Sequence, residues 1–113
     1  MMTEHFVTLF NNLFLPQGMA LHRSMIRNVG NFCLWIICVD ETTFNVLEEL
    51  KLKNTRLLLL SDLETPELLR VKEKRTIVEY CWTLTPFAPK FVFEAAPNVN
   101  RVCLLYTSDA ADE

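Results

Sequence analysis

Short polar segments follow three predicted strands of this sequence, and their side chains are the best placed for ligand chemistry. In a parallel α/β sheet the strands end at a common edge, and ligands bind in the crevice beyond that edge. Small amides, hydroxyls and carboxylates there can hydrogen-bond a polar ligand. These segments are residues 10–12, 40–42 and 61–62, and a fourth is expected after Val102.

The scarcity of glycine limits the kind of ligand. The chain has only two glycines, Gly18 and Gly30. It therefore lacks both the glycine-rich turn of dinucleotide-binding folds and the phosphate loop that ends in Gly-Lys-Ser/Thr. A nucleotide bound here would need its phosphate charge neutralised by basic side chains or by a divalent cation held on carboxylates.

Other site classes find little support. His5 and His22 are not at metal-ligand spacing with any acid or cysteine, so they are predicted to be structural or solvated. The four cysteines contain no Cys-x-x-Cys pair, which favours reduced cysteines used as small apolar residues. The net charge of −3 and the scattered Lys and Arg residues disfavour a nucleic-acid surface.

Strand and helix patterns alternate along the chain and predict the fold class. Half of the residues are hydrophobic, which is typical of a globular domain. The run 32–39 is apolar on both alternating faces, as expected of a central strand covered on both sides. The order predicts an α/β, Rossmann-like, mostly parallel sheet with helices on both faces. We expect strands at 6–10, 32–39, 56–60 and from 101, and helices at 18–29, from 41, from 66, and over 76–96 with a break near 85.

The order and spacing of several motifs resemble the start of a nucleotide-diphospho-sugar glycosyltransferase of the GT-A fold. The resemblance covers nearly all of residues 5–102. Its later part resembles the segment that leads into Tyr-Leu-Asp-Ala-Asp in that family. The motifs are Phe-Val-Thr-Leu-Phe-Asn (6–11), Leu-Pro-Gln-Gly (15–18), Ala-Leu-His-Arg-Ser (20–24), Leu-Trp-Ile-Ile-Cys-Val-Asp (34–40), Val-Glu-Tyr-Cys-Trp-Thr-Leu-Thr-Pro (78–86) and Asn-Arg-Val (100–102).

The resemblance implies which residues bind a nucleotide sugar. It implies that Thr8 and Asn11 meet the base and ribose. It further implies that the donor site is lined by Arg75, Glu79, Tyr80 and Trp82. The family's Asp-x-Asp motif holds Mn²⁺ or Mg²⁺ on the diphosphate, and this ion assists departure of the leaving group. No catalytic or metal-ligating residue is assigned in this chain.

Each of these residues also has a structural alternative. Thr8 suits a strand, Asn11 a turn, and Arg75 a solvated helix start. Tyr80 and Trp82 suit a core, and for Trp82 the core is favoured slightly. Glu79 has apolar neighbours in sequence and is expected to pair with a cation, for which Arg75, one helical turn earlier, is the simplest candidate.

The last eleven residues, 103–113, resemble translated sequencing-adapter sequence of the kind found in reading frames assembled from environmental DNA. We therefore expect residues 1–102 to be the N-terminal, nucleotide-sugar-binding half of a GT-A domain, truncated in its fourth strand, and 103–113 to be a non-native tail. Asp109 and Asp112 imitate a metal motif but depart from Asp-x-Asp spacing, so they are assigned no site.

These patterns together predict a fragment of a metal-dependent glycosyltransferase. The whole enzyme would transfer a sugar from a nucleotide-diphosphate sugar to an acceptor hydroxyl, with a carbohydrate or glycolipid as acceptor, and the fragment itself would be inactive. The alternatives are a non-catalytic α/β interaction module and a nucleotidyltransferase. The N-terminus lacks a basic segment before its apolar run, and the longest apolar run is far shorter than a bilayer span, so a cytoplasmic protein without a transmembrane segment is expected.

Overall fold

A computed structural model describes residues 3–105, which form four strands and five helices. The strands are β1 (Glu4–Phe10), β2 (Phe32–Cys38), β3 (Thr55–Leu59) and β4 (Cys103–Leu104). The helices are α1 (Leu15–Asn28), α2 (Glu41–Leu50), α3 (Pro66–Glu73), α4 (Ile77–Leu84) and α5 (Ala88–Ala95). Three short 3₁₀ turns, at residues 12–14, 60–62 and 85–87, join neighbouring elements.

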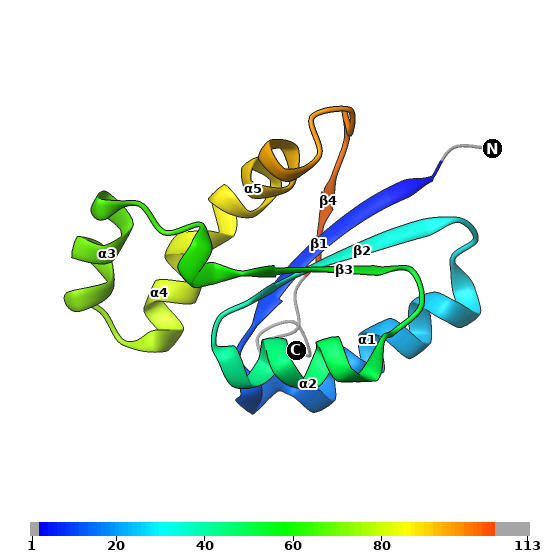
Figure 1. Ribbon diagram of the computed structural model, residues 1–113, viewed down its shortest axis with the longest axis horizontal. Coiled ribbons are helices and arrows are strands. Elements are labelled where there is room, and N and C mark those ends of the chain that lie inside the picture. The colour runs from blue at the N-terminus through cyan, green and yellow to red at the C-terminus, as the bar shows by residue number, and fades with distance from the viewer. Residues whose placement is uncertain (1–2, 106–113) are drawn as a thin grey trace.

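The strands form one parallel sheet in the order β3-β2-β1-β4, which confirms the predicted α/β, Rossmann-like class (Figure 1). β2 pairs along its whole length with β1, from Phe32 opposite Glu4 to Cys38 opposite Phe10. β3 pairs with the other side of β2. The carboxyl ends of β1, β2 and β3 therefore lie at one edge of the sheet.

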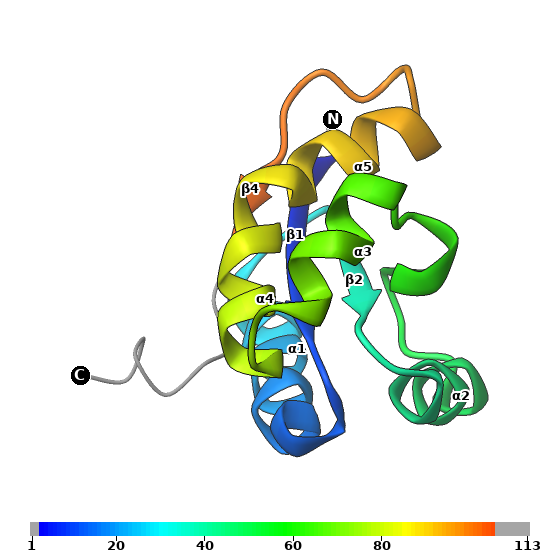
Figure 2. The same ribbon diagram turned by 90° about the vertical axis from the view of Figure 1, so that its left-hand side faces the viewer.

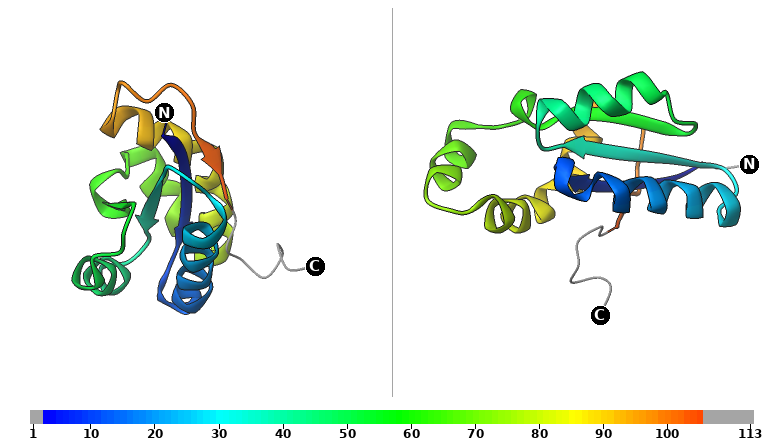
Figure 3. Two further views of the ribbon diagram at one scale, coloured as in Figure 1. Left: turned by 90° about the vertical axis from the view of Figure 1, so that its right-hand side faces the viewer. Right: turned by 90° about the horizontal axis from the view of Figure 1, so that it is seen from below.

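Helices cover both faces of the sheet, as the apolar pattern of β2 predicts. Trp35 and Ile37 point into a core shared with α3, α4 and α5. Leu34 and Ile36 point into a second core shared with α1 and α2. Figure 2 and Figure 3 show α1 and α2 on one side of the sheet and the other three helices on the opposite side. α3 and α4 extend past the carboxyl ends of the strands (Figure 1).

Helix α1 begins three residues before the predicted start at Gly18, because Pro16 fits a first helical turn, where its missing N–H costs nothing. Gly18 is thus a buried helical residue rather than a loop residue. A β-carbon at this position would clash with the ring of Phe10. The absent side chain lets the Phe10 ring pack directly on the helix backbone.

The predicted starts of α2 and α3 and the break near Thr85 are confirmed. Asp40 and Thr65 cap α2 and α3 through their side chains, which accept hydrogen bonds from backbone N–H groups in the first turn. The helical segment that follows Thr76 is interrupted by a 3₁₀ turn at Thr85–Phe87. Pro86 lies in that turn, where a proline cannot continue the α-helical hydrogen bonding.

The fourth strand differs from its predicted start at Arg101. It comprises only Cys103 and Leu104, which pair with Phe6 and Val7 of β1. Arg101 instead forms two hydrogen bonds of 2.9 and 3.0 Å with the carboxylate of Glu4. Asp109 and Asp112 of the predicted tail lie outside the described residues. No helix within residues 3–105 has both the length and the apolar character needed to cross a membrane.

Candidate functional site

Asp40 joins the carboxyl ends of β1 and β2. One carboxylate oxygen accepts a 2.7 Å hydrogen bond from the backbone N–H of Thr43 and so caps α2. The other accepts a 3.2 Å hydrogen bond from the backbone N–H of Asn12, which follows β1. Partial burial disfavours the charged carboxyl, but hydrogen bonds from Thr43 and Asn12 outweigh it and lower the pKa of Asp40. Asp40 therefore fixes the loop that would face a ligand.

Asn11 presents a hydrogen-bond donor at the carboxyl edge of the sheet. Its side-chain oxygen accepts a 3.0 Å hydrogen bond from the backbone N–H of Leu13 and so caps the 3₁₀ turn. The turn-forming role suggested by the sequence is thus present. The side-chain NH₂ makes no hydrogen bond with the described residues and can donate to a ligand. Leu13, two residues later, exposes 72% of its surface beside it.

Thr8 lies inside the domain. It is on the face of β1 that packs against α1 and α2, and none of its surface is exposed. Its hydroxyl oxygen has no hydrogen-bond partner among the described residues. In this conformation Thr8 is a core residue, and its predicted contact with a base stays a prediction.

Tyr80 belongs to a buried polar cluster at the carboxyl end of β3. Its hydroxyl donates a 2.6 Å hydrogen bond to a carboxylate oxygen of Glu64, whose side chain is only 5% exposed. The Lys72 ammonium lies 3.3 Å from that oxygen and 5.7 Å from the centre of the Tyr80 ring. Burial, and then the hydrogen bond and charge of Glu64, raise the pKa of Tyr80 well above its usual range. The cluster fastens α4 to α3 and to the segment before it.

Glu79 does not pair with Arg75 as the sequence predicts. Its carboxylate oxygen accepts hydrogen bonds of 3.0 Å from the backbone N–H of Thr76 and 3.2 Å from the Thr76 hydroxyl. Thr76 in turn accepts from the Glu79 N–H, which completes a capping box at the start of α4. These hydrogen bonds, with a smaller contribution from the charge of Arg75, lower the pKa of Glu79. The side chains of Glu79 and Arg75 are both exposed.

Trp82 is at the surface, which corrects the slight preference for a core position. It exposes 61% of its surface, whereas Tyr80 and Leu84 of the same helix are fully buried. Two residues turn a helix by about 200°, so Trp82 points away from the side that Tyr80 and Leu84 bury. An exposed indole on α4 is available to stack on a ligand or a partner.

The structure thus divides the six predicted residues into two groups. In the first group, Thr8 and Tyr80 are buried and the exposed Glu79 closes a helix cap. In the second group, Asn11, Arg75 and Trp82 keep groups that form no hydrogen bond or ion pair with the described residues. Sequence reasoning missed Glu64 and Lys72. Their only local signal is a carboxylate placed directly before the helix start at Thr65-Pro66, because the pairing with Tyr80 spans 16 residues.

No metal centre is found in the described part of the chain, and three of its cysteines have raised pKa values. No group of three or more His, Cys, Asp or Glu side chains within residues 3–105 is arranged to hold a metal ion. The four cysteines are free. Burial raises the pKa of Cys33 and Cys81, and raises that of Cys38 to about 12, so these three thiols are poor nucleophiles at neutral pH.

Two curated proteins of Bacillus subtilis (strain 168) are similar to this chain. It is 36% identical over 101 residues to "Uncharacterized protein YfnF", a match that covers 89% of this chain and 33% of that protein. It is 34% identical over 86 residues to "Uncharacterized protein YfnD", covering 76% of this chain and 28% of that protein. No family model and no solved structure matches. The chain therefore spans about a third of the length of the curated relatives that it matches.

Proposed function

We propose that this chain is the nucleotide-binding part of a glycosyltransferase that uses a nucleotide-diphosphate sugar. The observation that supports the proposal best is the polar edge of the parallel sheet. There Asp40 holds the β1 and β2 loops together, and Asn11 keeps a free donor. In sheets of this class ligands bind at the carboxyl edge, and this edge has no glycine loop for phosphate. The family resemblance supplies the choice of a nucleotide sugar.

Three of the predicted site residues, together with Leu13, would contact the donor. The Asn11 amide NH₂ would donate to an oxygen of the base or ribose, with the exposed Leu13 beside it as an apolar surface. The Arg75 guanidinium forms no ion pair with the described residues and would offset diphosphate charge. The Trp82 indole would stack on a planar base. Tyr80 and Glu79 would act indirectly, because they fix the helix that presents Arg75 and Trp82.

The remaining steps belong to the whole protein and are proposed for it alone. It would transfer the sugar to an acceptor hydroxyl of a carbohydrate or glycolipid, with Mn²⁺ or Mg²⁺ on the diphosphate. The described residues include no cluster of side chains that fits such an ion. The contribution of this chain is to bind and orient the nucleotide.

A nucleotide titration followed by ¹H–¹⁵N NMR tests the proposal. We expect uridine, guanosine, adenosine, cytidine or thymidine diphosphate to shift the amide signals of Asn11 and Leu13 and the indole N–H signal of Trp82. Binding should be weak, with a millimolar dissociation constant, or about 4 kcal/mol, because the metal site is not part of the described residues. The absence of shifts at this edge with all five nucleotides would refute the proposal. Tight, metal-dependent binding would contradict our assignment of no metal site to this chain.

A matched pair of charge variants separates the role of Asn11 in binding from its role in folding. Asn11→Asp keeps the oxygen that caps the turn but removes the donor and adds a negative charge near the phosphates. Asn45→Asp adds the same charge on the exposed surface of α2. We expect the Asn11 variant to melt like the wild type and lose nucleotide binding, and the Asn45 variant to keep both.

A further inference from the structure

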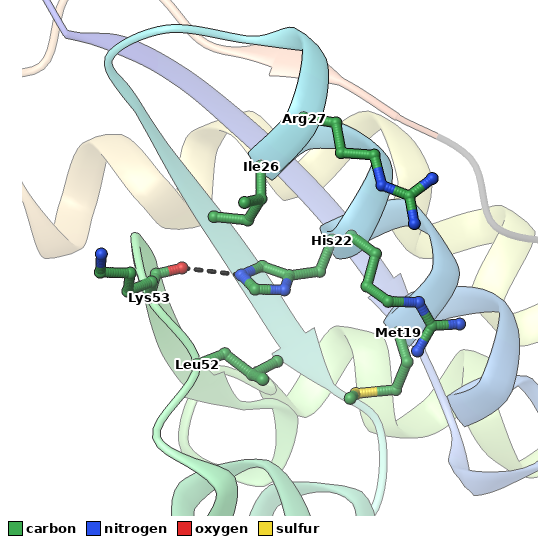
Figure 4. Close-up of a pocket in the computed structure, with 7 residues that line it drawn as sticks. Met19, His22, Ile26, Arg27, Leu52 and Lys53 are labelled. Carbon is green, nitrogen blue, oxygen red and sulfur yellow. Dashed lines mark hydrogen bonds between the residues drawn. The ribbon is translucent and has the colours of Figure 1, made fainter.

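A shallow pocket lies between α1 and the turn that follows α2, on the side of the sheet opposite α3, α4 and α5. Its volume is about 420 Å³ (Figure 4). Lys53 lies two residues before the first residue of β3, so the pocket opens towards the amino edge of the sheet, away from the carboxyl edge where the nucleotide is proposed to bind. The lining residues are Met19, His22, Arg23, Ile26, Arg27, Leu52 and Lys53.

The pocket has an apolar floor with cations beside it. Ile26, which is 43% exposed, forms part of that floor together with Met19 and Leu52. Arg23 and Arg27 are four residues apart on α1 and therefore lie on the same flank. Lys53 lies on the opposite flank, and Figure 4 shows its ammonium and the Arg27 guanidinium pointing away from each other. The lining includes no carboxylate.

His22 fixes the shape of this pocket. It is 6% exposed, and its Nε2 lies 2.7 Å from the backbone carbonyl oxygen of Lys53. Because a carbonyl can only accept, Nε2 must carry the hydrogen. The bond fastens the turn at Lys53 to α1, so the two cationic flanks are held apart at a defined separation.

The charges of the pocket are unbalanced. Arg23, Arg27 and Lys53 are exposed and form no ion pair with the described residues, although the chain carries a net charge of −3. The nearest acidic residues in sequence are Glu48 and Glu49 of α2, which do not line the pocket. An acidic protein thus concentrates uncompensated positive charge around one exposed and two partly buried apolar side chains.

We propose that this pocket docks the protein on an anionic phospholipid surface. Cations that point to opposite sides of an apolar floor match several headgroups lying in one plane better than one small anion, which would need converging donors. Phosphate groups would pair with Arg23, Arg27 and Lys53, and the glycerol and upper acyl carbons of a lipid would contact Met19, Ile26 and Leu52. Docking there would leave the carboxyl edge open to solvent. The inference does not depend on the proposed nucleotide site.

Vesicle flotation with the full chain tests the electrostatic part. The probes are vesicles of pure phosphatidylcholine and of equimolar phosphatidylcholine and phosphatidylglycerol. We expect binding only to the anionic vesicles, with loss in high salt. The triple variant Arg23→Gln/Arg27→Gln/Lys53→Gln should bind at least tenfold more weakly, since each basic residue near such a surface contributes about a fivefold gain in partitioning. The control variant Arg70→Gln/Lys74→Gln/Lys90→Gln has the same net charge and should lose less than threefold.

A second pair of variants tests the apolar floor. Ile26→Ser removes the exposed floor residue, and Leu69→Ser removes an equally exposed leucine, 44% against 43%, from α3. We expect only the Ile26 variant to weaken vesicle binding, while circular dichroism melts show that both remain folded. Absence of wild-type binding to anionic vesicles, or equal losses in the two triple variants, would overturn the proposal. Release from vesicles by millimolar glycerol 3-phosphate or inorganic phosphate would assign the pocket to a free phosphate compound instead, and would equally overturn it.

Discussion

Replacing Tyr80 by phenylalanine tests whether the buried Tyr80–Glu64 hydrogen bond holds α4 in place. The change removes only the hydroxyl, so the ring keeps its packing and its contact with Lys72. The Glu64 carboxylate, 5% exposed, would then retain Lys72 as its remaining partner among the described residues. A hydrogen bond to a charged acceptor contributes about 1.5–3 kcal/mol, and we expect Tyr80→Phe to lower the free energy of unfolding by about 2 kcal/mol.

Urea unfolding followed by circular dichroism measures this loss. Lys72→Met is the matched comparison, because it removes the other partner of Glu64. The Lys72 side chain is 44% exposed, so solvent screens its ion pair and the expected loss is about 1 kcal/mol or less. The decisive result is that Tyr80→Phe costs more stability than Lys72→Met, because Tyr80 is buried and Lys72 is partly exposed.

A double-mutant cycle with Glu64→Gln distinguishes the hydrogen bond from general packing. If the cost of Tyr80→Phe comes from a buried carboxylate left with too few partners, that cost should shrink by about 1 kcal/mol when residue 64 is already a neutral amide. A Tyr80→Phe protein within about 0.5 kcal/mol of wild type would refute the reasoning, because surface substitutions cause changes of that size. Strictly additive losses would refute it as well.

Three further outcomes follow from the geometry. Gly18→Ala should destabilise the fold by about 1–3 kcal/mol in urea unfolding, because the new methyl group meets an aromatic ring of β1, whereas Gly30→Ala, which meets nothing within 4 Å, should be neutral or slightly stabilising. In an alkaline titration monitored at 295 nm, Tyr80 should stay protonated well above pH 10. Because folding raises its pKa, the contribution of Tyr80 to the free energy of unfolding is complete below about pH 10 and falls above it. Because the pKa of Asp40 is lowered, its charge stabilises the fold above about pH 4, and this contribution is lost at lower pH. In urea unfolding measured across pH, the destabilisation caused by Asp40→Asn should therefore shrink below about pH 4.

Local chemistry explains which parts of the fold could be predicted from the sequence. The two-sided apolar run of β2 predicts a central strand, and the caps at Asp40 and Thr65 predict helix starts, because both depend on neighbours in sequence. The packing of Phe10 on Gly18 could not be predicted, because a glycine after a proline equally suits a loop and only the position of β1 makes it necessary.

The candidate site was harder to predict than the fold. α4 has eight residues and is apolar over most of its circumference, so its pattern does not show which side faces the sheet. The pattern therefore slightly favours a core position for Trp82, which is in fact exposed. Glu64, the partner of Tyr80, precedes α3 in sequence whereas Tyr80 follows it, and no periodicity links the two residues.

Replacing the six predicted site residues is expected to have different effects on stability and on nucleotide binding. Under the proposed function, Glu79 and Tyr80 affect a ligand through the position of α4, because both already form contacts within the protein. Their replacement should therefore lower stability and weaken nucleotide binding together. Arg75→Gln and Trp82→Phe alter exposed groups, and they should weaken binding while the free energy of unfolding stays within about 0.5 kcal/mol of wild type. If instead the Arg75 and Trp82 variants bind nucleotide as well as the wild type, the donor site does not include α4, and any nucleotide bound at the carboxyl edge is held by the loops around Asn11 and Asp40.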